Sequence, residues 1–548
     1  MDGDQKGDAG KKDLRARSLD FLDRFLHSKH SNIYLAILLL IIASLPRFFY
    51  IGRDIHPNGV DEGVQIMAGR MLDAGYEFYT QINTVQAPLM LSIYGAIEGD
   101  PIIFRIFSTL ASLMIMICVM WVGKRIGGRH VMVAAGAFAA MDLMFLHESR
   151  LASLDMFCLL WIVLAVAFFI KYRQSGKKWA VLLMGFSLGI GAMIKLFAVI
   201  AAGIMGIIML LDWVNDTEIS ILKKLKTRKY LPHRKYQDVK FIHMVLLLLS
   251  FSLVVLFIMA RFGIMNVIEG MFLNQLHRPF APFTTKLRYF GIFVLLNSIA
   301  FPFFFLGFKP LYKRPEGVIP IITIGFFLYF MFQAATWIHH FVFLSPGLSV
   351  TAGVGVIRLG KMIDRYRRKK ESMKLPVPTK TAGRTILYMQ VILMLLVAVI
   401  GGGFSLVVKE RGQSAQYKAA SLVEDLTGPD DFVISGDPMI PAIADRPQPP
   451  PVVNVARLKF PDVTNDQMNE TTIIYGVEVV IITYHLAEME GYVDFIEKHY
   501  KRKARYVDNT LPLLEEEDEY RVFYLPDDSD LRNHELWRLE KLPVPEER

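Results

Sequence analysis

The sequence has 548 residues, and 53% of them are hydrophobic. The apolar residues gather in long runs, such as VLLLLSFSLVVLFIMA at 245–260, and this excludes a simple array of soluble domains. The net charge of +9 does not indicate nucleic-acid binding, because the basic residues fall in short segments between the apolar runs. Cys118 and Cys158 both lie inside such runs, so we expect core residues and not a disulfide or a metal pair.

Eleven membrane-spanning helices are predicted from these runs, because about 20 apolar residues are needed to cross a bilayer. As one helix the stretch 179–211 would be too long for a single crossing, so we place a break near Lys195. The predicted spans are 32–51, 101–123, 131–147, 151–170, 179–194, 196–211, 241–262, 289–308, 317–335, 341–357 and 385–408. They predict a polytopic all-α membrane domain over 32–408.

The basic residues indicate how the spans are oriented. Lys and Arg are concentrated in alternate connections, and such connections usually face the cytoplasm. The basic segments are 1–31, 124–130, 171–178, 213–240, 309–316 and 358–384. We therefore expect a plasma-membrane protein with a cytoplasmic N-terminal segment, 1–31, no cleavable signal peptide, and an odd number of spans. The loop 52–100 and everything after residue 408 then lie outside the cytoplasm.

The first outer loop, 52–100, contains two predicted helices. Apolar residues recur at helical spacing over 61–74, so we expect this helix to lie on the membrane surface. A second helix is predicted over 88–97, where a proline occupies the first turn. Asp61 and Glu62 open the first of these helices. The loop itself leaves two interpretations open. In one, Asp61 is an N-cap and Glu62 is a first-turn acid favoured by the helix dipole; in the other, these acids take part in a reaction.

A second group of charges lies in the turn HESRLASLDMF at 147–157, between the third and fourth spans. We expect Glu148 and Arg150 to face the outer surface. Asp155 is already inside a span, where a carboxylate is costly, so we expect it to pair with Arg150 or another cation.

The tail predicts a small extracytoplasmic α/β domain over 409–548. Its strand-like apolar stretches are 431–435, 477–484 and 520–525. Helical periodicity appears over 416–426 and 486–500. The intervening segment 441–453 is too rich in proline for either element.

Three of these features together resemble the membrane glycosyltransferases of the type C fold. They are Asp61-Glu62 after the first span, ESRLASLD at 148–155, and Lys195 in GAMIKLFAV. Within that group the chain is most similar to the protein O-mannosyltransferase and lipid A aminoarabinose transferase superfamily, over roughly residues 32–408. The resemblance implies inverting transfer of a sugar from a polyprenyl (dolichyl or undecaprenyl) phosphate to an acceptor hydroxyl on the outer face.

The resemblance also implies roles for particular residues. Asp61 matches the acid that deprotonates the acceptor, and Glu62 would support it. A phosphate leaving group needs cations where charge develops. The candidates for binding the donor phosphate are Arg150, Lys195, Arg278, Arg288 and Gln86. Many relatives of the aminoarabinose type carry a lysine at the position of Gln86, and this departure shifts weight to the arginines. Lys286 is better explained as an interfacial side chain.

Further outer residues are candidates for substrate binding. They are Glu148, His277, His339 and His340. No metal site is predicted, because adjacent histidines on a helix point about 100° apart. A divalent metal stays open, since other type C enzymes use one.

The implied partners are a polyprenyl-phosphate-linked sugar, membrane lipid, and a protein, glycan or lipid acceptor, with no nucleic acid. The alternative function is a transporter or flippase of a lipid-linked or anionic substrate. Transporters usually place ionisable residues near the midplane and show repeat symmetry, and neither is evident here. A receptor or assembly scaffold would leave the carboxylates of the first loop unexplained.

Overall fold

The computed structural model describes residues 31–52, 59–97, 99–216, 240–274, 278, 280–312, 314–371, 381–410, 415–455, 463–508 and 518–540. The basic segment 1–30 and the candidate His277 lie outside these residues.

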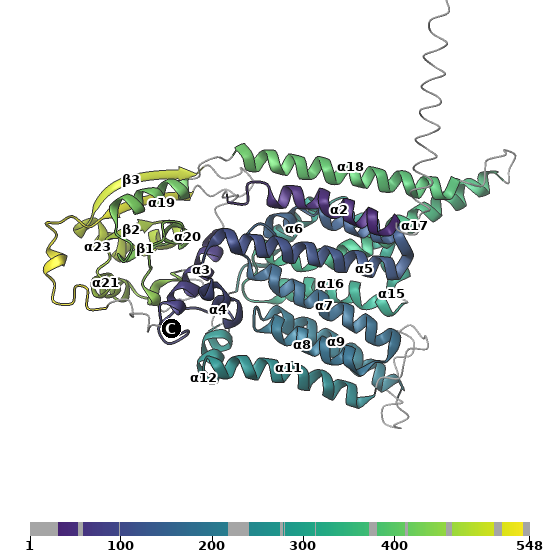
Figure 1. The fold of residues 1–548 in the computed structure, drawn as a ribbon, viewed down its shortest axis with the longest axis horizontal. Coiled ribbons are helices and arrows are strands. Elements are labelled where there is room, and N and C mark those ends of the chain that lie inside the picture. Colours follow the sequence, from purple (N-terminus) through teal and green to yellow (C-terminus); the bar gives the residue numbers. More distant parts are fainter. Residues whose placement is uncertain are drawn as a thin grey trace, which may run out of the picture.

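A bundle of long apolar helices forms one part of the molecule, and a small mixed sheet lies beyond one end of it (Figure 1). The helices of the bundle are α2 (Ser31–Phe48), α5 (Pro101–Met141), α6 (Leu143–Glu148), α7 (Leu154–Ser175), α8 (Lys178–Ala192), α9 (Phe197–Asp216), α11 (Phe241–Arg261), α12 (Ile264–Val267), the π-helix η1 (Ile268–Leu273), α14 (Phe283–Leu296), α15 (Ala300–Tyr312), η2 (Pro315–Gly317), α16 (Val318–Phe332), the 3-10 helix η3 (Ile338–Leu344), α17 (Ser345–Glu371) and α18 (Thr381–Glu410).

Among the described residues, five helices are long and apolar enough to cross a membrane, or six if one bent pair counts as a span. Shorter apolar helices, such as α2 and α8, accompany them. The chain is thus a multi-pass membrane protein, while the number eleven stays a prediction. The predicted break near Lys195 is confirmed, because α8 ends at Ala192 and α9 begins at Phe197.

The predicted turn between the spans 101–123 and 131–147 is confirmed: both lie in α5, but Gly127 and Gly128 leave helical geometry, Gly128 with a φ of +72°, and Gly136 packs back against Met120. One predicted span differs from the structure. The predicted span 289–308 is broken into α14 and α15, whose axes differ by 92°. Pro302 lies in the first turn of α15, where proline is tolerated because its missing N–H would have no partner within the helix.

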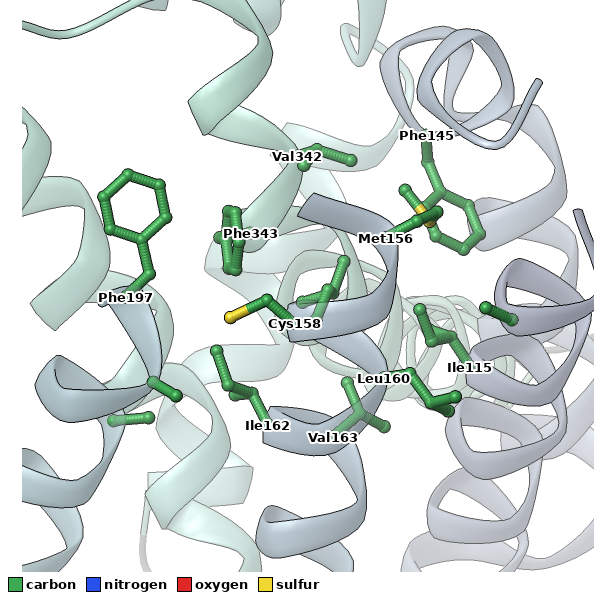
Figure 2. Close-up of a cluster of buried hydrophobic side chains, with 14 of the residues drawn as sticks. Ile115, Phe145, Met156, Cys158, Leu160, Ile162, Val163, Phe197, Val342 and Phe343 are labelled. Atoms are coloured by element: carbon green, nitrogen blue, oxygen red, sulfur yellow. The ribbon is translucent and has the colours of Figure 1, made fainter. Parts of the chain in front are cut away.

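The core of the bundle is apolar and closely packed (Figure 2). Side chains of α5, α7, α9 and η3 meet there, including Ile115, Leu160, Phe197 and Phe343. Cys158 is buried among them and both cysteines are free thiols, as expected from the sequence.

The C-terminal domain (residues 415–540 as described) contains a four-stranded sheet of order β1-β2-β4-β3. β1 and β2 are parallel, and the other neighbours are antiparallel. The strands are β1 (Val433–Ser435), β2 (Val479–Ile482), β3 (Lys501–Asp508) and β4 (Asp518–Tyr524). Three strands match predicted stretches. β3 was not predicted, because KRKARYVD carries four cations and no apolar run.

Helices cover this sheet and fill its connections. They are α19 (Ala415–Leu426), α20 (Met439–Ile443), η4 (Pro450–Val452), α21 (Asn465–Ile474), α22 (Tyr484–Ala487), α23 (Glu490–His499) and η5 (Asp530–Asn533). The predicted helices 416–426 and 486–500 are confirmed, although the second is divided before Glu490. The proline-rich segment 441–453 is not wholly irregular as predicted, since the short helix α20 ends inside it and the 3-10 turn η4 lies within it.

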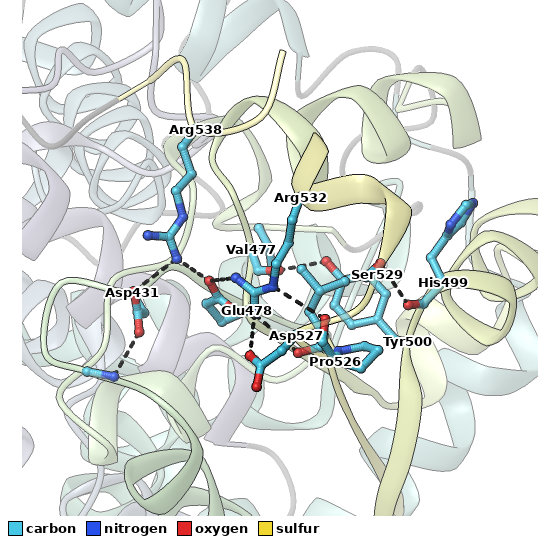
Figure 3. Close-up of polar contacts among 12 residues, drawn as sticks. Asp431, Val477, Glu478, His499, Tyr500, Pro526, Asp527, Ser529, Arg532 and Arg538 are labelled. Atoms are coloured by element: carbon cyan, nitrogen blue, oxygen red, sulfur yellow. Dashed lines mark hydrogen bonds and ion pairs between the residues drawn. The ribbon is translucent and has the colours of Figure 1, made fainter. Parts of the chain in front are cut away.

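The last described segment binds the carboxylate of Glu478 and, through Arg538, that of Asp431 (Figure 3). Arg532 holds both oxygens of Glu478, at 3.0 and 2.7 Å, and Arg538 also donates to Glu478. Glu478 directly precedes β2 and is buried, so the pairing satisfies a charge that would otherwise be costly.

The first outer loop forms α3 (Gly59–Asp73) and α4 (Pro88–Ala96), which lie between the bundle and the sheet (Figure 1). Both predicted helices are therefore confirmed. Their expected environment is corrected: Val64, Met67 and Met71 of α3 are buried against protein, so this apolar stripe does not rest on lipid. The covering elements are α4 on one side and α20 on the other.

Candidate functional site

Two carboxylates and a histidine meet at the end of the bundle next to the C-terminal domain. The Nε2 atom of His339 lies 3.9 Å from Oδ2 of Asp61 and 3.7 Å from Oδ2 of Asp155. The three residues come from the first turns of α3, α7 and η3. The positive end of a helix dipole favours acidic side chains at such positions. Asp61 is 35% exposed, so its carboxylate can be reached from outside the protein.

Asp155 is paired with Lys195. The ammonium of Lys195 donates to Oδ1 of Asp155 at 2.6 Å and lies 5.0 Å from the ring centroid of Phe197. The predicted pairing of Asp155 is thus confirmed, and its partner is Lys195, not Arg150. The non-helical residues between α8 and α9 place Lys195 beside this cluster.

Glu62 points in another direction from Asp61 and binds Arg105. Its two oxygens accept from Nε and Nη2 of Arg105 at 2.7 and 2.8 Å, and one of them also accepts the backbone N–H of Ala152 at 2.8 Å. Both side chains of the pair are 2% exposed. Glu62 therefore joins α3, α5 and the turn before α7, and its carboxylate is engaged with Arg105 and Ala152.

Glu148 is buried at the end of α6 and accepts a hydrogen bond of 3.2 Å from Nδ1 of His147, where the ring is protonated at that nitrogen. Burial raises the pKa of this carboxyl. The hydrogen bond from His147 and the charges of His147, His339 and Lys195 together lower it by more, so the pKa lies below its ordinary range. Glu148 is thus an ionised group behind the cluster, contributing negative charge near Lys195.

The structure corrects the assignment of Arg150 as a phosphate ligand. Its terminal nitrogens donate to the backbone carbonyls of Pro46, Arg47 and Tyr50, and its side chain is 1% exposed. Pro46 and Arg47 lie in the last turn of α2, where carbonyls have no partner within the helix, and Tyr50 follows the end of the helix. Arg150 therefore caps α2 from inside the protein.

Arg278 lies near the cluster. Burial lowers the pKa of its guanidinium, and the negative charge of Asp61 opposes this shift. Its Nε is buried and forms no hydrogen bond within the described part of the chain. Arg288 is exposed on α14. Lys286 is buried and donates to the carbonyl of Gln333, which corrects its interpretation as an interfacial side chain.

The remaining candidates occupy different environments. His340 is buried: its ring stacks on Phe330, with centroids 5.8 Å apart, and its Nδ1 accepts the backbone N–H of Trp337 at 3.3 Å. Gln86 is partly exposed, and its backbone carbonyl accepts the hydroxyl of Tyr79 at 2.8 Å. Within the described residues, no group of three or more His, Cys, Asp or Glu side chains could hold a metal ion.

Sequence reasoning missed Arg105. The signal was present, because this arginine lies inside the apolar run 101–123, and a charge within a span needs a partner. The partner, Glu62, is 43 residues away in the chain, so local spacing does not reveal it.

Comparison with known proteins identifies the membrane part. Residues 95–268, which include Arg105, Glu148, Asp155 and Lys195, match the model of the family described as dolichyl-phosphate-mannose-protein mannosyltransferase. The chain is a membrane glycosyltransferase. This match favours the transferase interpretation over the transporter alternative. No match was found among curated proteins.

Two solved structures of ArnT show the same fold. ArnT from Cupriavidus metallidurans in the apo state superposes with a TM-score of 0.60 at 14% identity, covering 89% of this glycosyltransferase and 97% of ArnT. ArnT bound to undecaprenyl phosphate gives 0.59 at 14% identity, covering 91% and 99%. The archaeal oligosaccharyltransferase AglB from Archaeoglobus fulgidus, in complex with an inhibitory peptide and a dolichol-phosphate, gives 0.49 at 13% identity, covering 87% and 74%.

Proposed function

We propose that the protein is an inverting glycosyltransferase that moves a sugar from a polyprenyl phosphate to an acceptor hydroxyl, with Asp61 as the general base. The observation that supports this best is the cluster of Asp61, Asp155, Lys195 and His339. It combines an accessible carboxylate with a cation at the end of a membrane bundle, where a lipid-linked phosphate and a water-soluble acceptor can meet. The donor class agrees with the matched family description and with the undecaprenyl phosphate in ArnT.

The chemistry follows from these groups. The acceptor oxygen attacks the anomeric carbon as Asp61 takes its proton, and the bond from that carbon to the phosphate oxygen breaks. The polyprenyl phosphate leaves with inversion, and negative charge grows on its oxygens. Lys195 and Arg278 are the cations that we assign to that charge. Asp155 holds the ammonium of Lys195 toward the cluster. His339 lies between the two carboxylates and orients Asp61.

We further propose that the cluster faces the outer side of the plasma membrane. The alternating Lys and Arg content of the connections supports this orientation. In this proposal the membrane domain covers 32–408, with eleven spans, and the domain over 409–548 is extracytoplasmic. An acceptor hydroxyl would then approach Asp61 from the side of the C-terminal domain.

The test is transfer from a radiolabelled polyprenyl-phosphate sugar in membranes that contain the wild type or Asp61→Asn. Asparagine keeps the shape but cannot accept the proton, so we expect at least about a hundred-fold loss of transfer. Asp73→Asn is the matched control, because Asp73 is an exposed carboxylate at the far end of the same helix. Unchanged transfer by Asp61→Asn would contradict the assignment of the base. No consumption of such donors by the wild type would contradict the donor class.

A further inference from the structure

The C-terminal domain contacts the first outer loop at several points along its length. The hydroxyl of Tyr417 donates to the carbonyl of Gly52. Arg70 lies 3.2 Å from a carboxylate oxygen of Asp445. The N–H of Asn83 donates to the carbonyl of Pro450 at 3.2 Å. These contacts occur both before and after Asp61 in the sequence, so the loop is held from both sides.

The closest approach is between α3 and α20, at Gly63. A Cβ atom added to Gly63 would lie 2.1 Å from the backbone nitrogen of Met439 and 2.6 Å from the carbonyl carbon of Pro438. Both atoms belong to the backbone, so no side-chain rotation could relieve the overlap. Any residue other than glycine must push the two helices apart.

The α20 side of this contact is rigidly held. The carboxylate of Asp437 accepts the N–H of Met439 at 3.1 Å and the side-chain amide of Gln416 at 2.7 Å. The hydroxyl of Ser435, at the end of β1, accepts the N–H of Asp437 at 3.1 Å. These polar groups are buried, so moving α20 would break hydrogen bonds that water cannot replace.

We propose that the C-terminal domain is a positioning element for sugar transfer, which sets the place of Asp61 through the contact of Pro438 and Met439 with Gly63. This inference rests on the proposed role of Asp61, two residues before Gly63 on the same helix. A displacement of about 1 Å at a reacting group can cost a hundred-fold in rate. Lys195 is held by Asp155 and Phe197 of the bundle. We therefore expect its binding to the donor phosphate not to depend on the C-terminal domain.

The first experiment compares Gly63→Ala with Gly203→Ala on α9, where an added Cβ meets nothing within 4 Å. For Gly63→Ala we expect kcat to fall by about ten-fold or more while the KM for the donor stays within about two-fold. Amide hydrogen exchange over residues 59–73 should become faster in the same variant. Gly203→Ala should match the wild type in all three measurements. A folded Gly63→Ala protein with unchanged kcat and unchanged exchange would overturn the inference.

A second pair of variants covers the outcome in which Gly63→Ala does not fold. Tyr417→Phe removes the hydroxyl that reaches Gly52, and Tyr500→Phe removes a hydroxyl that donates to Val477 within the domain. We expect faster exchange over 59–73 and a lower kcat for Tyr417→Phe alone. Equal behaviour of the two variants would overturn the inference. Exchange does not require turnover, so an inactive wild type would count against the proposed function and not against this contact.

Discussion

Replacing Glu62 with glutamine would remove the carboxylate that binds the buried guanidinium of Arg105. The pair is 2% exposed on each side and is joined by bonds of 2.7 and 2.8 Å. Removing one partner of a buried ion pair costs about 3–5 kcal/mol. The amide oxygen of glutamine can still accept one hydrogen bond, so we expect a value near the lower end, about 3 kcal/mol. That is about a hundred-fold in the ratio of folded to unfolded protein.

The measurement is thermal stability of the purified protein in detergent, followed as the fraction that stays monodisperse after heating. Glu77→Gln, an exposed glutamate of the same loop, is the matched control and should not differ from the wild type. The double variant Glu62→Gln/Arg105→Met removes both charges and should be more stable than Glu62→Gln alone, because no unpaired charge remains. The reasoning is refuted if Glu62→Gln is as stable as Glu77→Gln, or if the double variant is no more stable than Glu62→Gln.

Two further predictions concern the surroundings of Asp61 and the acid stability of the fold. Arg278→Gln should raise the KM for the donor about ten-fold with little change in stability, since it removes a charge-assisted contact to phosphate; an unchanged KM in donor titrations would remove Arg278 from the site. The pKa of Glu148 in the fold lies below its ordinary value of 4.5, because the hydrogen bond from His147 and the charges of His147, His339 and Lys195 together outweigh burial. A depressed pKa stabilises the fold above the ordinary value, and this stability is lost as the pH falls through the lowered pKa. Glu148→Gln should therefore be less stable at neutral pH and flatten the loss of thermal stability on acidification, whereas a parallel pH profile would disprove the coupling.

The sequence predicted those parts of the molecule that depend on local pattern. The break near Lys195 followed from helix length, and α3 and α4 followed from apolar spacing and a first-turn proline. β3 was not predicted from the sequence, because half of its residues are basic. It is an edge strand of the sheet, and charged side chains are common on edge strands.

The contacts within the site could be predicted only in part, because they join distant segments. Arg150 looked like an outward-facing cation, but it is used to cap a helix that ended about a hundred residues earlier. Asp155 was expected to find a cation, and only the folded chain shows that this is Lys195. Charge in an apolar run predicts that a partner exists, while the tertiary fold decides which partner it is.

The ties made by Arg150 and by Glu62 with Arg105 have a consequence for the order of assembly. They connect residues 46–62 with 105–152, all of which belong to the first third of the chain. Chains are made from the N-terminus, so these ties can form while residues 415–540 are still unsynthesised. The backbone of Met439 reaches Gly63 only after the last transmembrane segment has been made. The segment around Asp61 can thus be fixed early by contacts with residues close to it in the sequence. The C-terminal domain, which is made last, then covers the outer side of this segment.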